Sequence, residues 1–408
     1  MPEVDVAIVG GGPVGACAAA LLAHGIGGTG LRVALIEPQV PQPPSVGAPP
    51  DARVVAISRA SQYVLESAAA WQGIAGPRVC AYERMRIWHE SVAADGEEVL
   101  IFDAADVGEP DLGHIVESRL LQTALIDAFS AAGGHLEPAQ FAALAIDADG
   151  VSVTTSRGEL RARLVIGADG AQSALRSAVG LTAEVSEYHQ TAIVATVATS
   201  RSHQSTAWQR FMSNGTLAFL PLFDGTSSIV WSADEALARQ LMAASDAEFA
   251  AALDRASDLA LGATRLVSEP VSFPLRHVRA PRYVAQRIAL IGDAAHVVHP
   301  LAGQGVNLGL LDAAALAQVV ARAVGAREDP GSLTVLRAYE RWRKSEVAVM
   351  DAAIDAFDRL LAHGTGPVAR LAQRGLSWVS HSEELRRLFI RRALGVTGEL
   401  PDAARRAV

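Results

Sequence analysis

The chain has 408 residues, of which 50% are hydrophobic and 19% charged, and its formal net charge is −9. This composition supports a large folded core and excludes a disordered chain, and the acidic balance disfavours a nucleic-acid-binding protein. The two cysteines, Cys17 and Cys80, are too few for a disulfide framework or a zinc site. Without a signal peptide or an uncharged apolar run of about 18 residues, a cytoplasmic protein of a reducing compartment is expected.

The first predicted elements are a strand, a glycine turn, a helix and a second strand. The apolar run Val4–Val9 ends in Gly10-Gly11-Gly12-Pro13-Val14-Gly15, and small apolar residues follow it. A second apolar run, Leu31–Ile36, is closed by Glu37. This order is typical of a βαβ unit.

The glycine turn of this unit suits the binding of a dinucleotide. Gly10 permits a tight turn after the strand, Gly12 lets the backbone approach a pyrophosphate, and Gly15 allows close contact between helix and strand. The residues from Ala16 to Leu22 have a helix pattern, and the N-terminus of this helix offers free N–H groups to an anion. Glu37, at the end of the next strand, is placed to accept hydrogen bonds from ribose hydroxyls.

The later apolar runs predict further elements in chain order. They are a proline-rich loop at 38–50, a helix at 60–69, strands between 84 and 102, a helix at 117–132, a strand at 163–166, β-type runs at 192–197, 217–222 and 228–231, a strand at 288–291, and a helix at about 306–324. The last 80 residues are predicted to be helical.

These elements predict an α/β protein in which a discontinuous Rossmann-like domain carries an inserted, mixed or antiparallel β-sheet domain and a helical C-terminus. The dinucleotide-binding domain would comprise residues 1–75, 103–180 and 275–350. The inserted sheet domain would comprise 76–102 and 181–274, and the C-terminal helical region 351–408.

Two further turns follow predicted strands. The first is Gly167-Ala168-Asp169-Gly170, and the second begins Gly292-Asp293 and continues through His299-Pro300-Leu301-Ala302-Gly303-Gln304-Gly305-Val306-Asn307. Alone, each indicates little, because an aspartate after a strand is often only a helix cap.

Together and in this order, the three turns resemble the flavoprotein aromatic hydroxylases of the p-hydroxybenzoate hydroxylase fold. Four further segments are similar to the ubiquinone-biosynthesis hydroxylases of proteobacteria, so that the resemblance covers essentially the whole chain. The segments are Asp51-Ala52-Arg53 with Ala56-Ile57-Ser58, Leu112–Glu117, Ala218–Leu222 and Gly292–Asn307.

The resemblance implies FAD as the cofactor and gives roles to matching residues. Glu37 would hold the adenosine ribose, Arg53 and Arg119 would flank the phosphates and ribityl chain, and Asp293 would bind a ribityl hydroxyl. Residues 300–307 would lie along the isoalloxazine, where a helix N-terminus stabilises negative charge on reduced flavin. The predicted cofactor-binding residues are Gly10, Gly12, Pro13, Gly15, Glu37, Arg53, Arg119, Asp169, Asp293, Pro300, Gly303, Gln304, Gly305 and Asn307.

Some of these residues have a plainer alternative. Without the resemblance, Arg53 and Arg119 would be interpreted as residues of ordinary surface salt bridges. Asp169 and Arg176 would likewise be interpreted as a local helix cap and an ion pair. His296 and His299 are interpreted as packing and hydrogen-bonding residues, because no third metal ligand stands at a suitable spacing.

The resemblance also implies the reaction. NAD(P)H would act as a transient reductant, since the chain has no second dinucleotide fold, and O₂ would yield a C4a-hydroperoxyflavin that hydroxylates a phenol ring. The favoured substrate is a polyprenylated ubiquinone precursor contacted by Phe219, Pro221 and Trp231, although each of these equally fits a plain sheet core. The sequence identifies no catalytic acid or base.

Two alternatives stay open at this point. The same flavin chemistry could act on a soluble phenol or secondary metabolite, or the chain could be a non-catalytic flavoprotein subunit of a quinone-biosynthesis complex. Val368–Val396, with its arginines and apolar residues, is either a peripheral docking surface for the inner membrane or a complex, or a helix packed on its own domain. A homo-oligomer is compatible with the sequence as well.

Overall fold

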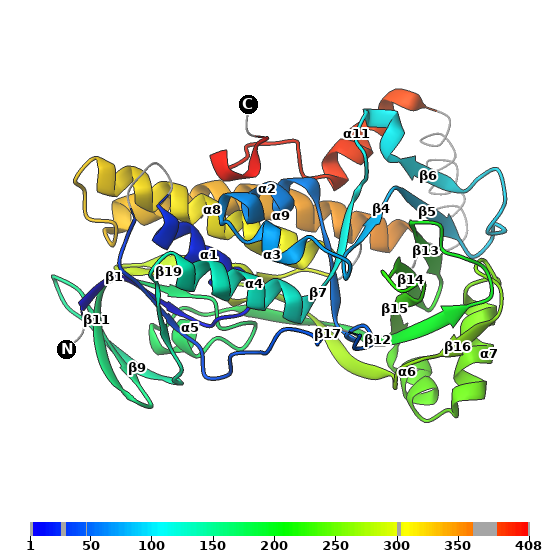
Figure 1. The fold of residues 1–408 in the computed structure, drawn as a ribbon, viewed down its shortest axis with the longest axis horizontal. Coiled ribbons are helices and arrows are strands. Elements are labelled where there is room, and N and C mark those ends of the chain that lie inside the picture. Colours follow the sequence, from blue (N-terminus) through cyan, green and yellow to red (C-terminus); the bar gives the residue numbers. More distant parts are fainter. Residues whose placement is uncertain (1–2, 26–29, 46, 300–302, 362–381, 407–408) are drawn as a thin grey trace.

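The computed structural model describes residues 3–25, 30–45, 47–299, 303–361 and 382–406. Within them the chain forms sheets of eight, nine and three strands. The two large sheets lie towards opposite ends of the molecule's long axis, and two long helices, α8 (Gln304–Gly325) and α9 (Leu333–Leu361), extend along it (Figure 1).

The eight-stranded sheet contains the predicted βαβ unit. β1 (Glu3–Val9) lies between β2 (Val33–Ile36) and β11 (Gly158–Gly167) and is parallel to both. The central parts of these strands are continuous apolar runs because their side chains are almost fully buried, as parallel strands require; they are residues 6–9, 33–36 and 164–166. The other strands are β8 (His135–Glu137), β9 (Phe141–Ile146), β10 (Val151–Thr155), β18 (Val284–Ala285) and β19 (Ile288–Leu290).

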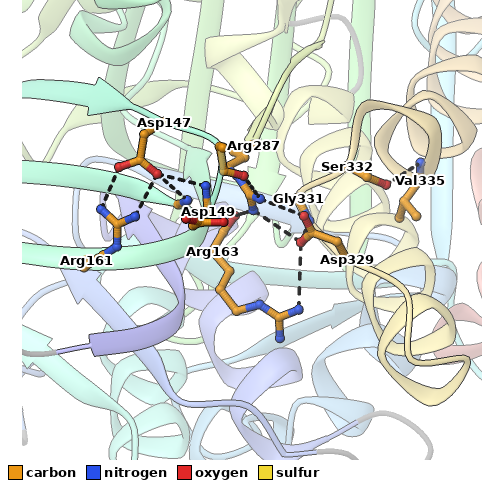
Figure 2. A network of polar contacts seen from close by, with 11 residues as sticks. Asp147, Asp149, Arg161, Arg163, Arg287, Asp329, Gly331, Ser332 and Val335 are labelled. Carbon is orange, nitrogen blue, oxygen red and sulfur yellow. Dashed lines mark hydrogen bonds and ion pairs between the residues drawn. The ribbon is translucent and has the colours of Figure 1, made fainter.

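Helix α1 (Pro13–His24) packs against both α4 (Ser118–Ala131) and α8 beside this sheet. Segments far apart in the sequence therefore share one core, in which β19 pairs in parallel with β11. Arg287, just before β19, reinforces this junction by donating to the carbonyl oxygen of Arg163 at 3.0 Å and pairing with Asp329 at 2.8 Å (Figure 2).

The nine-stranded sheet is mostly antiparallel, and one of its faces is covered by α6 (Glu235–Met242) and α7 (Asp246–Ala256). One strand, β5, pairs in parallel with β13, so the sheet is mixed. The strands are β5 (Arg84–His89), β6 (Leu100–Asp103), β12 (Glu184–Thr199), β13 (Thr206–Met212), β14 (Gly215–Pro221), β15 (Ser227–Asp234), β16 (Thr264–Leu266), β17 (Val271–Arg279) and β20 (His296–Val297).

A small sheet of β3 (Val54–Ile57), β7 (Gly113–Glu117) and β4 (Cys80–Tyr82) lies between these parts. Leu220 and Leu222 of the nine-stranded sheet contact it through an apolar cluster with Ala56 and Ile115. The remaining helices include α2 (Arg59–Ser67), α3 (Trp71–Ile74), α5 (Ala174–Ala178) and α11 (Glu383–Ala393).

The predicted α/β class, with its inserted sheet and helical C-terminal part, is confirmed. The exact domain limits stay a prediction. β5 and β6 do join the strands between 184 and 279 in one sheet, whereas β4 belongs to the small sheet. Much of the 368–396 stretch, including Trp378, lies outside the described residues.

Helix α8 is long and apolar enough to cross a membrane by length and composition. However, 67% of its most apolar window is buried inside the protein, where α8 packs against α1 and α9. This is the environment of a core helix in a folded domain.

Candidate active site

The three predicted turns meet at one edge of the eight-stranded sheet, where β1, β11 and β19 end. A methyl group placed on Gly10 would lie 2.4 Å from the carbonyl oxygen of Ala168, which joins the first turn to the second. A methyl group on Gly292 would lie 3.1 Å from the Val14 side chain, which joins the third turn to the start of α1. In open parallel sheets, ligands bind in the crevice at this carboxyl edge.

The N-terminus of α1 is suited to a phosphate group. Gly12 caps the helix without any side-chain hydrogen bond, and Pro13 is its first residue. A methyl group on Gly12 would meet no atom within 4 Å, whereas one on Gly15 would lie 2.0 Å from the carbonyl oxygen of Gly10. Gly15 therefore serves helix–strand packing, while Gly12 faces open space beside free N–H groups, as a pyrophosphate site requires.

Glu37 anchors the first turn from the end of β2. One carboxylate oxygen accepts from the N–H of Gly11 at 2.7 Å, and the other accepts from the N–H of Gln39 at 3.0 Å. Gln122 of α4 donates to the carbonyl oxygen of Gly11 at 2.8 Å. Glu37 and Gln122 therefore hold the turn from two sides. The half-buried Glu37 carboxylate lies beside the glycine turn, with which it was predicted to form one binding site.

The second turn is tied mainly to its own surroundings. Asp169 accepts from the hydroxyl of Ser173 at 2.5 Å and from the N–H of Leu175 at 3.0 Å, which is the local capping arrangement. Arg176 is buried and donates to the carbonyl oxygens of Ala171 and Ala294, each at 2.8 Å. It thereby joins the second turn to the third. Asp169 has the local cap of the plainer alternative, whereas Arg176 donates to backbone oxygens rather than pairing with Asp169.

Asp293 is the acidic group at the mouth of the third turn. Its side chain is exposed to solvent, yet burial by surrounding protein raises its pKa, while His296 and Arg53 act to lower it. A group that is both accessible and closely surrounded lies in a concave part of the surface. Asp293 therefore lies at the wall of a cleft.

The two predicted arginines differ in their surroundings. Arg53 is exposed and close enough to Asp293 to act on its pKa. Arg119 is partly exposed and forms a bidentate pair with Asp51, at 2.7 and 3.0 Å. Arg119 thus has the salt bridge of the plainer alternative, whereas Arg53 extends towards the cleft wall.

The N-terminus of α8 resembles that of α1. Gly303 caps the helix with φ +63° and without a side-chain hydrogen bond, and Gly305 has open space where a side chain would lie. Asn307 is buried: its side-chain oxygen Oδ1 accepts from the N–H of Ser58 at 2.9 Å, and its side-chain Nδ2 donates to the carbonyl oxygen of Ala56 at 2.8 Å. Asn307 therefore fixes α8 to β3, Gln304 begins the helix, and Pro300 lies outside the described residues.

Behind the third turn lie two charged residues that the sequence reasoning missed. Asp312 of α8 and Arg343 of α9 are buried and paired at 2.7 Å, and Asp312 also contacts His296 at 2.6 Å. Asp312 is a lone acid in the apolar sequence of α8, and this pattern could have identified it as a buried, paired charge. His299 instead contacts Gln190 at 3.0 Å, so the two histidines have different partners.

The three predicted substrate residues belong to the nine-stranded sheet. Phe219 and Trp231 are each 2% exposed and pack in the core beneath α6 and α7, where the Trp231 ring lies 6.2 Å from that of Phe249. Pro221 is buried at the end of β14. The structure therefore gives Phe219 and Trp231 the sheet-core position, which the sequence equally allowed. On the opposite face of the sheet, Leu220 meets Ala56.

Two cavities of about 330 and 380 Å³ share Arg59 along α2. Neither is lined by a predicted cofactor or substrate residue. Arg59 is paired there with Asp111 at 2.7 Å, so the shared charge is already balanced. These cavities are separate from the edge where the three turns meet.

The site suits a dinucleotide with a negatively charged middle. It offers two helix N-termini without side-chain caps, open space at Gly12 and Gly305, and the accessible acid Asp293. Residues 92–352 match the FAD-binding-domain family. The fold and this match, which covers more than half of the chain, define the class as a flavoprotein with an FAD-binding domain.

Similar proteins narrow this class. The ubiquinone hydroxylase UbiL of Rhodospirillum rubrum is 37% identical over 98% of this chain and 92% of its own length. The 3-demethoxyubiquinol 3-hydroxylase of Escherichia coli is 35% identical over 96% of this chain and 98% of its own. This chain belongs to the ubiquinone-biosynthesis hydroxylases of the FAD-binding-domain family.

A solved structure supports the same fold. The p-nitrophenol 4-monooxygenase of Pseudomonas putida aligns with a TM-score of 0.77 over 97% of this chain and 99% of that chain. Its sequence identity is 19%, so this likeness concerns the fold alone. The predicted family and cofactor are confirmed, whereas the individual residue roles stay predictions.

Proposed function

We propose that this flavoenzyme hydroxylates the aromatic ring of a polyprenylated ubiquinone precursor, with NAD(P)H as reductant and O₂ as the source of oxygen. The names of its relatives support the quinone-type substrate. FAD supplies the redox chemistry when bound, while the protein binds and orients the substrate and excludes water. The structural feature that carries the proposal is an apolar row on the nine-stranded sheet.

The row runs across four neighbouring strands on the face opposite α6 and α7. The strand register places Val271 beside Val194, Val194 beside Val230, and Val230 beside Ala218. Neighbouring strands are about 4.8 Å apart, so these side chains form a continuous apolar path. At the β17 end, Val271 is 47% exposed, and Phe273, two residues along the same strand, is 45% exposed.

The same face reaches the proposed flavin loop. Leu220, next to Ser228 across the strands, contacts Ala56 of β3. A methyl group on Gly303 would lie 3.3 Å from the Ala56 side chain. An aromatic ring near Gly303 and a polyprenyl tail along the valine row would therefore share one surface, and exposed apolar side chains of this kind mark binding sites.

For the cofactor, we propose that the pyrophosphate lies at Gly12 and the N-terminus of α1, with Glu37 beside the adenosine ribose. The isoalloxazine would lie by Gly303 and the N-terminus of α8. Support comes from the free helix N-termini and the open space at the glycines.

We also propose peripheral contact with a quinone-containing membrane. Support comes from Val271 and Phe273 on β17 and from Leu388 of α11, which is 58% exposed beside Arg387 and Arg391. Apolar side chains flanked by arginines favour an anionic lipid surface.

The test is a comparison of two phenols with one enzyme preparation. FAD-loaded protein is mixed with NAD(P)H, and nucleotide oxidation and hydroxylated product are measured with a prenylated phenol in detergent and with its unprenylated head group. The proposal expects a lower KM for the prenylated phenol than for the unprenylated head group. Equal or better turnover of the soluble phenol would move the assignment to a soluble substrate, and flavin binding without any turnover would favour a non-catalytic subunit.

A further inference from the structure

A buried group of charges lies behind the third turn, on the side away from the cleft. The carboxylate of Asp312 is fully buried and accepts three hydrogen bonds. The donors are the N–H of Gly292 at 3.0 Å, the imidazole Nε2 of His296 at 2.6 Å and the guanidinium Nε of Arg343 at 2.7 Å. Because an ionised carboxylate only accepts, His296 carries a proton on Nε2.

Packing stability alone gives little reason for charges at this place. Burial acts to raise the pKa of the Asp312 carboxyl, but the nearby His296 and Arg343 lower it below its usual value, so the group stays ionised. Buried ion pairs often stabilise a fold no better than apolar residues of the same volume. What they do well is fix geometry, because each charge requires its partners at defined positions.

The geometry fixed here is that of the residues flanking Asp293. Gly292 adopts φ +57° and is wedged against Val14, with its N–H bound to Asp312. On the other side of Asp293, the carbonyl oxygen of Ala294 is bound to the buried Arg176. The backbone is thus held immediately before and after Asp293, whose side chain is the exposed one between Gly292 and His299.

We propose that Asp312 is a positioning residue for the cofactor. It holds Gly292 and His296, and through Arg343 it fixes α9 behind the turn, so that the Asp293 carboxylate is directed into the cleft. This inference rests on the proposed placement of FAD along the three turns.

The test measures FAD affinity and folding stability separately. In Asp312→Asn a single amide oxygen replaces two carboxylate oxygens, and the amide N–H₂ group faces at least one of the three donors. FAD titration of the apoprotein, followed by flavin fluorescence, should show a dissociation constant raised about tenfold. The absorption band of the bound flavin should shift as well, which a merely structural role would not produce.

Two further variants separate positioning from folding. Asp312→Asn combined with Arg343→Met removes the unpaired arginine, so the denaturation midpoint should recover while FAD affinity stays low. Asp254→Asn is the matched control, because Asp254 accepts from the N–H and hydroxyl of Thr264 at 2.8 and 2.7 Å on the far side of the nine-stranded sheet. It should lower stability without changing FAD affinity.

Three outcomes would overturn the inference. They are wild-type FAD affinity in Asp312→Asn, recovery of affinity together with stability in the double variant, and an equal loss of affinity in Asp254→Asn. The titration needs no substrate, so its result is independent of whether the proposed prenylated phenol is hydroxylated.

Discussion

At the scale of single residues, the glycines of the first turn perform two separate tasks. Gly15 is in contact with the backbone of Gly10, so its missing side chain is needed by the folded protein alone. Gly12 has a backbone conformation that other residues also adopt, and a methyl group on it would meet no neighbour within 4 Å. Its missing side chain is therefore needed only when a ligand is present. The same residue type thus serves packing at one position and binding three residues away.

The first prediction separates these tasks. Gly12→Ala should change the free energy of unfolding of the apoprotein by only about 0.5 kcal/mol, because the reduced freedom of the unfolded chain offsets a poorer helix cap. FAD affinity should fall at least about tenfold, since the methyl group occupies the proposed pyrophosphate position. Denaturant unfolding and FAD titration measure the two quantities.

The control for this prediction is Gly15→Ala. Its methyl group would overlap the carbonyl oxygen of Gly10 at 2.0 Å and approach Ala168 at 2.9 Å, so the apoprotein itself should lose about 1–3 kcal/mol or more of stability. Unchanged FAD binding in Gly12→Ala would place the pyrophosphate elsewhere.

At the scale of elements, the nine-stranded sheet shows what the sequence could and could not reveal. Alternation along β14 and β15 correctly groups Phe219 with Trp231 and, on the other face, Ala218 with Val230. It does not tell which face is covered, because that depends on where α6 and α7 fold back. From the sequence, Phe219 and Trp231 therefore fitted a substrate surface and a sheet core equally well, and the structure places both in the core.

The turns were more predictable than the sheet faces. A glycine turn is dictated by local geometry over a few residues, and the three turns carry the residues expected from the sequence. Asp312 and Arg343 come from two helices and are 31 positions apart, so only the fold shows that they meet. Long-range pairs of this kind leave little trace in local periodicity.

The second prediction uses two adjacent residues of β15 that point to opposite faces. Val230→Trp should obstruct the apolar row and raise the KM for a prenylated phenol about tenfold or more, while the free energy of unfolding changes little. Trp231→Phe should do the reverse, with stability lowered by about 1–3 kcal/mol and KM near the wild-type value. Steady-state kinetics and urea denaturation of both variants provide the comparison, and a KM effect confined to Trp231→Phe would place the substrate under α7 instead.

At the scale of the whole molecule, the proposed cofactor site draws on distant parts of the chain. The first turn follows β1, the second follows β11, and the third leads into α8, which packs against α1 and α9. A ligand that contacts all three turns would connect segments separated by almost 300 residues. Its binding energy therefore adds to the stability of the whole eight-stranded sheet rather than to one loop.

The third prediction follows from this arrangement. FAD at about one hundred times its dissociation constant should stabilise the protein by about 2.7 kcal/mol, which corresponds to a rise in Tm of about 3 °C for a chain of this size. Differential scanning calorimetry of the apoprotein with increasing FAD measures the shift. FMN lacks the adenylate half that Glu37 and the first turn are proposed to hold, so it should produce a clearly smaller rise. Equal shifts with FAD and FMN would mean that the first turn contributes no binding energy, and the pyrophosphate placement at Gly12 would have to be abandoned.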